Sequence, residues 1–450
     1  MRGQRSEIRD QKSESRGQRS EIRSQGEKNS LSLTSDLCSL TSGLCITRMK
    51  ILFYNHTGQA SGAERLLLMI LARLDRERFD PVVVCPEDGP LMKLAAEFAP
   101  VAAVESLQAR FTWRADHLIG YLRSFLQVIH KFRQKVLSIK PDLIHANSIR
   151  AGLVATAATF GLKTRVVWHL HDLLPRHPLS SVIRASAFLS SRTQMIAVSQ
   201  AVADNFIGAF SPLKKRVQAI LNGIDMEKFQ PSQTARQAIR EELKLDHAEP
   251  VIGIVGQLTS RKGQLELVRA FARALSEIPQ ASLVIVGAPL FNRDEEYAAL
   301  LKQAAQELGI EERVRLTGAR SDVGAVMQAL DLLVINSSAE PFGLVAVEAM
   351  ACGIPILAAA SGGIPEIIEH GKTGWLVPPG DEQTLAAAIV SLSRQPALRG
   401  HLAEQGKSHV RSRFSADRYL EELQAFYSSD EVRRCGDRAE IRHAEAAKFA

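Results

Sequence analysis

Residues 332–359, LLVINSSAEPFGLVAVEAMACGIPILAA, decide the fold class of this chain. Two apolar runs, Leu332–Ile335 and Ile356–Ala359, flank an apolar stretch of helical length, Leu344–Ala351. Short apolar runs that alternate with helical stretches are typical of βαβ units, whose strands pair in parallel. The segment therefore predicts an α/β protein with a parallel sheet.

The same alternation continues on both sides of this segment. On the C-terminal side of the chain's middle, strands are predicted at Val251–Val255, Ser282–Val286, Val314–Leu316 and Gly374–Val377, with helices at Gln264–Ser276, Tyr297–Leu308 and Thr384–Ser393. Towards the N-terminus, strands are predicted at Lys50–Asn55, Pro81–Cys85, Leu143–Ala146, Val166–His169 and Gln194–Val198, with helices at Glu64–Leu74 and Leu118–Lys140. Two Rossmann-like α/β units in series are the predicted architecture.

The chain's 450 residues are enough for two such domains but too many for one ordinary core. We predict an N-terminal domain over 49–228, a C-terminal domain over 229–412, an amphipathic helix over 413–428 that packs back on the first domain, and a flexible tail over 429–450.

Residues 1–48 differ in composition from the rest of the chain. The heptapeptide GQRSEIR occurs at 3–9 and again at 17–23, in a polar stretch with nine Lys or Arg against six Asp or Glu. Such a segment buries too little apolar surface to offset the entropy lost on ordering. We expect either a basic interaction arm or, preferably, an extension ahead of a true start at Met49.

Composition limits the classes of function. The net charge of +7 is modest for this length, which disfavours nucleic-acid binding. The five cysteines are scattered, without a metal-binding spacing, and this pattern fits a reducing compartment. With neither a membrane-spanning apolar run nor a signal peptide in the sequence, we expect a cytoplasmic protein.

The most informative motif follows the strand that ends at Ile335. Glu340 falls in the loop after that strand, and Glu348 falls within the next helix, which is predicted to begin near Gly343. The free amides at a helix N-terminus, with the helix dipole, form an anion site, and a diphosphate would fit there. An unpaired carboxylate at Glu348 among Ala, Val and Met would be costly, which favours a functional role.

This motif resembles the signature of retaining GT-B glycosyltransferases of family four, in which two glutamates are separated by seven residues. The resemblance includes EPFG, EAMACGIP, GGIPE and GW-V-PPGD as they stand in residues 340–381, and it extends over most of Met49–Phe426. It implies a GT-B fold, with two Rossmann-like domains whose parallel sheets face a central cleft. It also implies that Glu348 holds the nucleotide ribose and Glu340 contacts the transferred sugar. Donor phosphate or sugar oxygens would meet the amides of Phe342, Gly343 and Leu344.

A second loop, GQLTSRKGQ at 256–264, follows the strand Val251–Val255. Its two cations, Arg261 and Lys262, could neutralise a leaving diphosphate as charge develops. The resemblance assigns Lys262 to the phosphates. Gln257 stands where the family has an arginine, so we expect either a neutral hydrogen bond from Gln257 or a charge supplied by Arg261.

The N-terminal half contributes a glycine-containing turn, GQASGAE at 58–64. Its spacing is not that of a dinucleotide-binding GxGxxG, which disfavours an NAD-dependent enzyme. The family has a similar glycine loop facing the donor and acceptor, and Gly58, Gly62 and Glu64 fall in it, with Ser61 in place of one glycine. A tight turn with a helix cap is the structural alternative.

Histidine and acidic residues complete the candidate site. His171, in WHLHD at 168–172, lies at a strand's carboxyl end and corresponds to a family histidine that approaches the sugar's primary hydroxyl; His169 is expected in the core. Glu366, in GGIPE, is a weaker donor-binding candidate. The remaining matches to the family are Ser199, Asn222, Gly223 and Asp225.

These observations predict a retaining transferase of class EC 2.4 that moves a sugar from a nucleotide-sugar to a saccharide or lipid-linked acceptor, in cell-envelope or exopolysaccharide synthesis. We expect no metal or other cofactor, no nucleic-acid partner, and at most peripheral contact with a membrane through the basic helix Leu118–Lys140. A nucleotide-sugar epimerase of the same fold and a catalytically silent binding subunit are the alternatives. The sequence names neither the sugar nor the base nor the acceptor.

Overall fold

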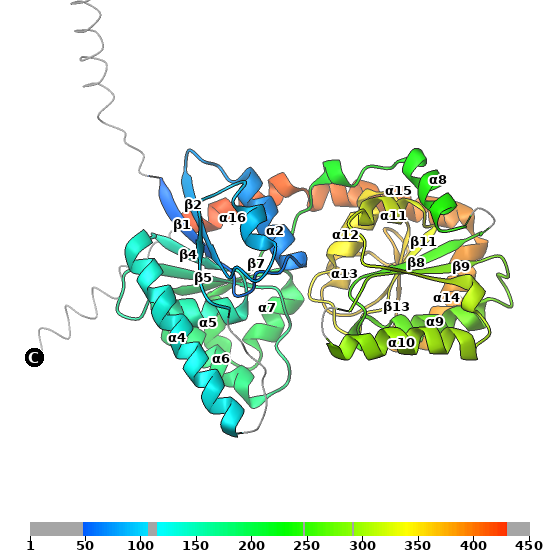
Figure 1. Ribbon diagram of the computed structural model, residues 1–450. Helices are drawn as coiled ribbons and strands as arrows, with labels where there is room; N and C mark the ends of the chain where they lie inside the picture. The colour runs from blue at the N-terminus through cyan, green and yellow to red at the C-terminus, as the bar shows by residue number, and fades with distance from the viewer. Residues whose placement is uncertain (1–47, 107–114, 246–247, 290–291, 430–450) are drawn as a thin grey trace, which may run out of the picture. The chain divides into compact units, whose positions relative to one another are not determined.

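A computed structural model describes residues 48–106, 115–245, 248–289 and 292–429 (Figure 1). The predicted N-terminal extension and C-terminal tail therefore lie, except for Arg48 and Ser429, outside the described residues. Apart from Arg48, Met49 and 76–78, the described residues belong to one compact unit, which carries both sheets.

The first half of the chain forms a parallel sheet of seven strands with the order β3-β2-β1-β4-β5-β6-β7. The strands are β1 Met49–Tyr54, β2 Phe79–Cys85, β3 Val101–Ala103, β4 Leu143–Ala146, β5 Arg165–Leu170, β6 Thr193–Ala197 and β7 Val217–Ala219. The helices are α2 Gly62–Arg73, α3 Leu91–Ala95, α4 Ala115–Ile139, α5 Ile149–Ala158, α6 Pro178–Leu189 and α7 Gln200–Ile207.

The second half forms a parallel sheet of six strands with the order β10-β9-β8-β11-β12-β13. Its strands are β8 Val251–Val255, β9 Ser282–Val286, β10 Val314–Gly318, β11 Leu332–Ile335, β12 Ile356–Ala359 and β13 Trp375–Val377. Its helices are α8 Gln233–Glu242, α9 Gln264–Ala274, α10 Asn292–Glu307, α11 Val323–Gln328, α12 Leu344–Ala351, α13 Ile364–Ile367, α14 Glu382–Arg394 and α15 Pro396–Arg413, followed by α16 Ala416–Ser428. The predicted α/β class with two parallel sheets is confirmed.

Each sheet is wound in both directions from a central pair of strands. In the first sheet the pair is β1 and β4, and in the second it is β8 and β11. Loops leave such a pair on opposite faces of the sheet, so a crevice forms at the carboxyl ends of the two strands, where α/β proteins bind ligands. We call these two places the β1/β4 edge and the β8/β11 edge.

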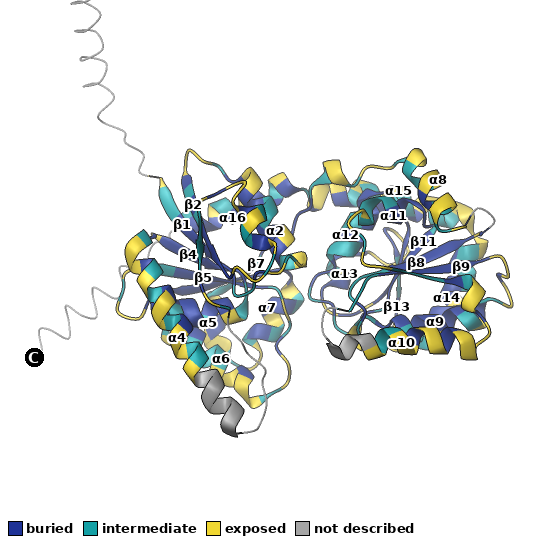
Figure 2. Ribbon diagram, in the orientation of Figure 1, coloured by how far each residue is buried: buried dark blue, intermediate teal, exposed yellow. Residues whose placement is uncertain are grey.

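The long helix α4 is accounted for by packing on its own sheet. Val128, Phe132 and Val136, spaced four residues apart, are buried, and the Phe132 ring stacks on Tyr54 of β1 at 4.0 Å between centroids. Figure 2 shows the opposite face of the helix as largely exposed or intermediate. The amphipathic pattern is thus explained by one buried face and one solvated face. Contact of this helix with a membrane stays a prediction.

The final helix, α16, packs against the first sheet, as predicted. Tyr427 forms a buried hydrogen bond of 2.8 Å with Nδ1 of His145 on β4. The side chain of Gln424 accepts a hydrogen bond from the amide of Asp75. Several elements have no counterpart among the predicted ones, including the helices α5, α6, α7 and α15 and two of the three-residue strands, β3 and β7. The two strands are only partly buried, and α15 buries only Leu402, Gly406 and Val410, so neither carries a strong apolar pattern.

No helix among the described residues is both long enough and apolar enough to cross a membrane.

Candidate active site

A pocket with a cavity volume of about 290 Å³ receives residues from both central edges. From the first half of the chain it is lined by Ser61, Gly62, Ala63, His171, Asp172, Val198 and Asn222. From the second half it is lined by Ile254, Val255, Arg261, Lys262, Val334, Ile335, Asn336, Ser337, Glu340, Pro341, Phe342, Gly343, Leu344 and Val345. Most of the predicted site residues are therefore brought together.

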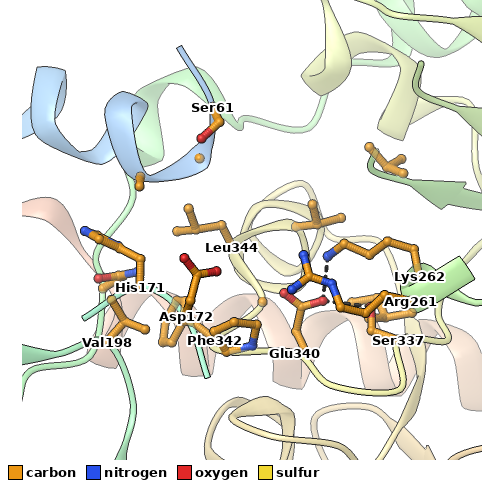
Figure 3. Close-up of a pocket in the computed structure, with 18 of the residues that line it drawn as sticks. Ser61, His171, Asp172, Val198, Arg261, Lys262, Ser337, Glu340, Phe342 and Leu344 are labelled. Carbon is orange, nitrogen blue, oxygen red and sulfur yellow. Dashed lines mark hydrogen bonds and ion pairs between the residues drawn. The ribbon is translucent and has the colours of Figure 1, made fainter. Parts of the chain in front are cut away.

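The strongest interaction in this pocket joins the two predicted catalytic loops of the second half. Nζ of Lys262 lies 2.7 Å from Oε2 of Glu340, and the same oxygen accepts a hydrogen bond of 2.8 Å from the hydroxyl of Ser337 (Figure 3). Glu340 is buried. The pair forms because β8 and β11 are hydrogen-bonded neighbours, so the loops that follow them meet. The ammonium and the hydroxyl together supply hydrogen bonds that offset the burial of this carboxylate.

The loop that carries Lys262 is fastened to the loop after β11. The side-chain amide of Asn336 donates to the carbonyl of Gly263 at 3.0 Å, and the amide of Ser338 donates to the carbonyl of Arg261 at 3.0 Å. Gly263 has a φ of +69°, and a Cβ there would lie 2.2 Å from the carbonyl oxygen of Asn336. Glycine is required at this close approach, and the exposed Arg261 side chain is left at the pocket's wall.

Helix α12 begins in this pocket, as predicted. Gly343 precedes its first residue and has a φ of +110°, which favours glycine. Phe342 is buried beside Phe414, with 6.1 Å between ring centroids, so its side chain belongs to the core. Phe342, Gly343 and Leu344 all line the pocket, at the N-terminal end of the helix, where unpaired amides can receive an anion.

His171 lies in the part of the pocket that the first sheet supplies. Its Nε2 is 3.1 Å from Oδ1 of Asn147, which directly follows β4. Its ring lies 3.9 Å from the ring of the fully buried His169. Burial lowers the pKa of His171 to about 3, so its imidazole is neutral at ordinary pH. His171 therefore enters the pocket as a hydrogen-bonding group and not as a cation.

Two family descriptions match this chain. Residues 60–228 match Glycosyltransferase Family 4, and residues 235–409 match Glycosyl transferases group 1. HepE from Anabaena, solved in complex with UDP-glucose, is 31% identical with a TM-score of 0.74, over 85% of this chain and 100% of that one. The chain belongs to the glycosyl transferases group 1 family. The predicted family and GT-B fold are confirmed, and with them the assignment to the transferases.

Curated relatives of this glycosyltransferase match over shorter stretches. N-acetyl-alpha-D-glucosaminyl L-malate synthase from Bacillus anthracis is 29% identical over 213 residues, which are 47% of this chain and 54% of the relative. D-inositol 3-phosphate glycosyltransferase from Mycobacterium marinum is 36% identical over 219 residues, 47% of this chain and 45% of the relative. The chain thus spans about half the length of these curated relatives.

Some of the residues predicted for this glycosyltransferase's site do not line the pocket. Glu348 is partly buried in α12; burial raises the pKa of its carboxyl group to about 7, and the positive charge of Arg65 offsets part of that shift. The backbone carbonyl of Gln257 accepts a hydrogen bond from the side chain of Gln264 at 2.8 Å.

Glu366 is the third predicted residue that does not line the pocket, and it is hydrogen-bonded to the start of α7. Its carboxylate oxygens accept hydrogen bonds of 2.7 and 2.8 Å from the amides of Gln200 and Ala201, the first residues of α7. Ser199 beside them donates to the carbonyl of Pro341 at 2.6 Å. In this structure Glu366 thus serves as an anion at a helix N-terminus.

Only part of the predicted glycine loop, residues 58–64, lines the pocket. Gly62 lines the pocket, whereas Gly58 and Glu64 do not. A Cβ at Gly58 would lie 2.5 Å from the carboxylate of Asp88 and 2.8 Å from the amide of Gly89, so Gly58 allows two loops to meet. The carboxylate of Glu64 accepts hydrogen bonds from Ser61 and Asn55.

The structure adds residues that the motif analysis did not assign to the site. Asp172 follows His171 and is exposed in the pocket's lining, and Ser337 holds Glu340. Asn222, a minor match to the family, is 3% exposed and lines the pocket, and its Oδ1 has no hydrogen-bond partner. Asp172 could have been noted from its place after a strand, in the WHLHD motif beside His171.

Among the described residues, no group of three or more His, Cys, Asp or Glu side chains is arranged to hold a metal ion. The prediction that the reaction needs no metal stays a prediction.

Proposed function

We propose that this protein is a retaining glycosyltransferase that moves a sugar from a nucleotide-sugar to a hydroxyl group of an uncharged saccharide, either free or lipid-linked. One observation carries the proposal. The Lys262–Glu340 pair, the N-terminal end of α12 and the neutral His171 line one pocket. A cationic side chain, unpaired amides and hydroxyl-binding groups are the elements that a sugar diphosphate needs.

The donor fits the half of the pocket at the β8/β11 edge. Arg261 and Lys262 supply positive charge for a diphosphate, and the amides that open α12 supply hydrogen-bond donors. Glu348, four residues beyond the first residue of this helix, would accept hydrogen bonds from the ribose. The complexes of HepE with UDP and with UDP-glucose make UDP-glucose the first donor to test.

The proposed reaction is substitution on one face of the sugar. The bond between the anomeric carbon and the diphosphate oxygen breaks, and a bond from the same carbon to the acceptor oxygen forms on that face. The acceptor's proton passes to the leaving diphosphate. Lys262 and Arg261 stabilise the charge that develops on the leaving group, while Glu340 and His171 orient the sugar.

The acceptor is proposed to be uncharged because of the pocket's other wall. Among the lining residues that the first half supplies, Asp172 is the one that carries a charge, since His171 is neutral. A phosphorylated acceptor, such as the name D-inositol 3-phosphate glycosyltransferase implies for that relative, would meet the carboxylate of Asp172. The hydroxyl groups of a saccharide can instead donate hydrogen bonds to Asp172 and to the unpartnered Oδ1 of Asn222.

Two measurements test this proposal. The first is a thermal-shift series with UDP, GDP, ADP and their glucose derivatives, in which a ligand at a hundred times its Kd adds about 2.7 kcal/mol of stability. We expect the shift with UDP-glucose. The second is proton NMR of the product formed from UDP-glucose and a saccharide acceptor. An α-linked product supports retention, a β-linked product rules it out, and a changed nucleotide-sugar without acceptor identifies an epimerase.

A further inference from the structure

A chain of hydrogen bonds, buried up to its last link, runs along the β1/β4 edge and ends at His171. Three residues form it ahead of the histidine, and we call them the amide relay: Glu64, Asn55 and Asn147. Asn55 follows β1 and Asn147 follows β4, and the register pairs Tyr54 with Ala146, so the two amides are adjacent. All three members of the relay are buried, at no more than 3% exposure.

The direction of donation in these hydrogen bonds is set at the end that lies farthest from His171. Nδ2 of Asn55 donates to the carbonyl of Thr57 at 2.6 Å and to Oε1 of Glu64 at 3.2 Å. Both are obligate acceptors, so the amide group of Asn55 faces them and its Oδ1 faces Asn147. Nδ2 of Asn147 must then be the donor to that oxygen, at 3.0 Å.

The final link sets the proton position on the imidazole. With its Nδ2 committed to Asn55, Asn147 presents Oδ1 to Nε2 of His171 at 3.1 Å. A carbonyl-type oxygen accepts only, so Nε2 carries the hydrogen. Because the pKa of His171 is lowered to about 3, its imidazole is neutral and Nδ1 keeps its lone pair.

The ring is also held from its other side. His169 packs on it with 3.9 Å between centroids, and Nδ1 of His169 is hydrogen-bonded to Nε2 of His145 at 3.2 Å. Tyr427 in turn holds His145 at 2.8 Å. The plane of the His171 ring and its tautomer are therefore both determined by buried partners.

We propose that the amide relay holds His171 as the Nε2–H tautomer, so that Nδ1 accepts a hydrogen bond from a hydroxyl group of the transferred sugar. The members of the relay are positioning residues, since they act through His171. The same carboxylate of Glu64 also binds the amide and the hydroxyl of the pocket residue Ser61, at 3.0 and 2.5 Å. The tautomer stands on the structure alone, whereas its role in sugar binding rests on the proposed function.

The tautomer is tested by long-range ¹H–¹⁵N NMR of the full chain, with His171→Gln used to assign the signal. We expect a neutral Nε2–H imidazole in the wild type and a mixture of tautomers in Asn147→Leu, which has a similar volume but no polar atoms. A wild-type Nδ1–H tautomer or imidazolium would overturn the inference. So would an unchanged tautomer in Asn147→Leu.

The role is tested by titrating UDP and UDP-glucose separately. Losing one neutral hydrogen bond should weaken UDP-glucose binding to Asn147→Leu by about threefold to tenfold, with UDP binding unchanged. The matched control is Ser148→Ala, which removes the hydrogen bonds of the Ser148 hydroxyl with the amide of Ala151 in α5 and with Nδ1 of His56, but leaves the relay intact. Equal weakening of both ligands, or none, with an altered tautomer would refute the role in sugar binding. Failure of the wild type to bind UDP-glucose would instead refute the proposed donor, while the NMR result still decides the tautomer.

Discussion

The two central edges of this glycosyltransferase have the same topology but carry different chemical groups. At the β8/β11 edge, Lys262 and Glu340 form a charged pair at 2.7 Å beside the start of a helix. At the β1/β4 edge, the relay ends at Asn147, which is hydrogen-bonded to the neutral His171. The first edge is suited to charge on a leaving group, and the second to the orientation of hydroxyl groups. Each prediction below tests this division, beginning with the largest expected effect.

Removing the charge at the β8/β11 edge should have the largest effect. Lys262→Ala deletes a cation that the proposed mechanism places on the leaving diphosphate, and it leaves Glu340 buried without its ionic partner. We expect kcat/KM to fall by about a hundredfold to a thousandfold, as for the loss of one donor to a developing anion. Steady-state kinetics with the established donor and acceptor would measure this.

The double variant Lys262→Ala/Glu340→Gln separates catalysis from stability. Breaking a buried ion pair by removing one partner costs about 3–5 kcal/mol, because a charge is left uncompensated. Neutralising Glu340 should restore most of the free energy of unfolding but none of the activity. Recovery of activity along with stability would show that Lys262 is only structural.

Alanine substitutions at Gly362, which lies against Glu340, and at Gly62 should destabilise the protein to different extents. Gly362 has a φ of +55°, and a Cβ there would lie 2.0 Å from the carbonyl oxygen of Glu340, so Gly362→Ala should destabilise the fold by about 3 kcal/mol. A Cβ at Gly62 meets nothing closer than the Cδ1 of Leu344 at 3.6 Å, and Gly62 does not have a positive φ. Gly62→Ala should therefore have a much smaller effect, and urea unfolding of the two variants measures the difference in their free energies of unfolding. Equal destabilisation would contradict it.

The β8/β11 edge was predictable from sequence because its interactions follow from short motifs. Glu340, Gly343 and Glu348 lie within one βαβ segment, β11–α12–β12, and the neighbouring strand contributes Lys262 through its own loop. A strand end, a loop and a helix start are local features, so each one could be placed before the contacts were known. The ion pair itself needed the strand order.

The relay as a whole was not predictable, because Asn55 and Asn147 carry no local signal. Asn55 and Asn147 are 92 residues apart and become neighbours only through the pairing of β1 with β4. Glu64 was expected to face the substrates, but its carboxylate is committed to Ser61 and Asn55. The bonds to Ser61 form the local helix cap that the sequence analysis gave as the structural alternative, whereas the bond from Asn55 depends on the folded turn. The contact of Glu366 with the start of α7 also depends on tertiary structure, and its role in donor binding stays a prediction.

Glu348 should make the stability of the protein depend on pH. Its folded-state pKa of about 7 lies above the ordinary value of 4.5, so the folded state binds the proton more tightly. Stability should therefore fall as the pH rises, by about 2 kcal/mol between about pH 5 and pH 7, and then level off. Glu348→Gln should abolish that part of the pH dependence. A chemical denaturation series with both proteins measures it, and parallel curves would contradict the raised pKa.

The smallest expected effect belongs to Asp172, the charged lining residue of the first half. If its carboxylate disfavours anionic acceptors, wild-type kcat/KM should be higher for glucose than for glucose 6-phosphate. Asp172→Asn should reduce the ratio of these two kcat/KM values by about fivefold. Such a change equals one interaction between unit charges of about 1 kcal/mol at 4 Å in water. Raising the salt concentration should narrow the ratio in the wild type but not in the variant, since screening acts only on the charge. If the wild type and Asp172→Asn both prefer the phosphorylated sugar, a cation outside the pocket's lining must bind the acceptor's phosphate. The division between a charged edge for the donor and a neutral edge for the acceptor would then be wrong.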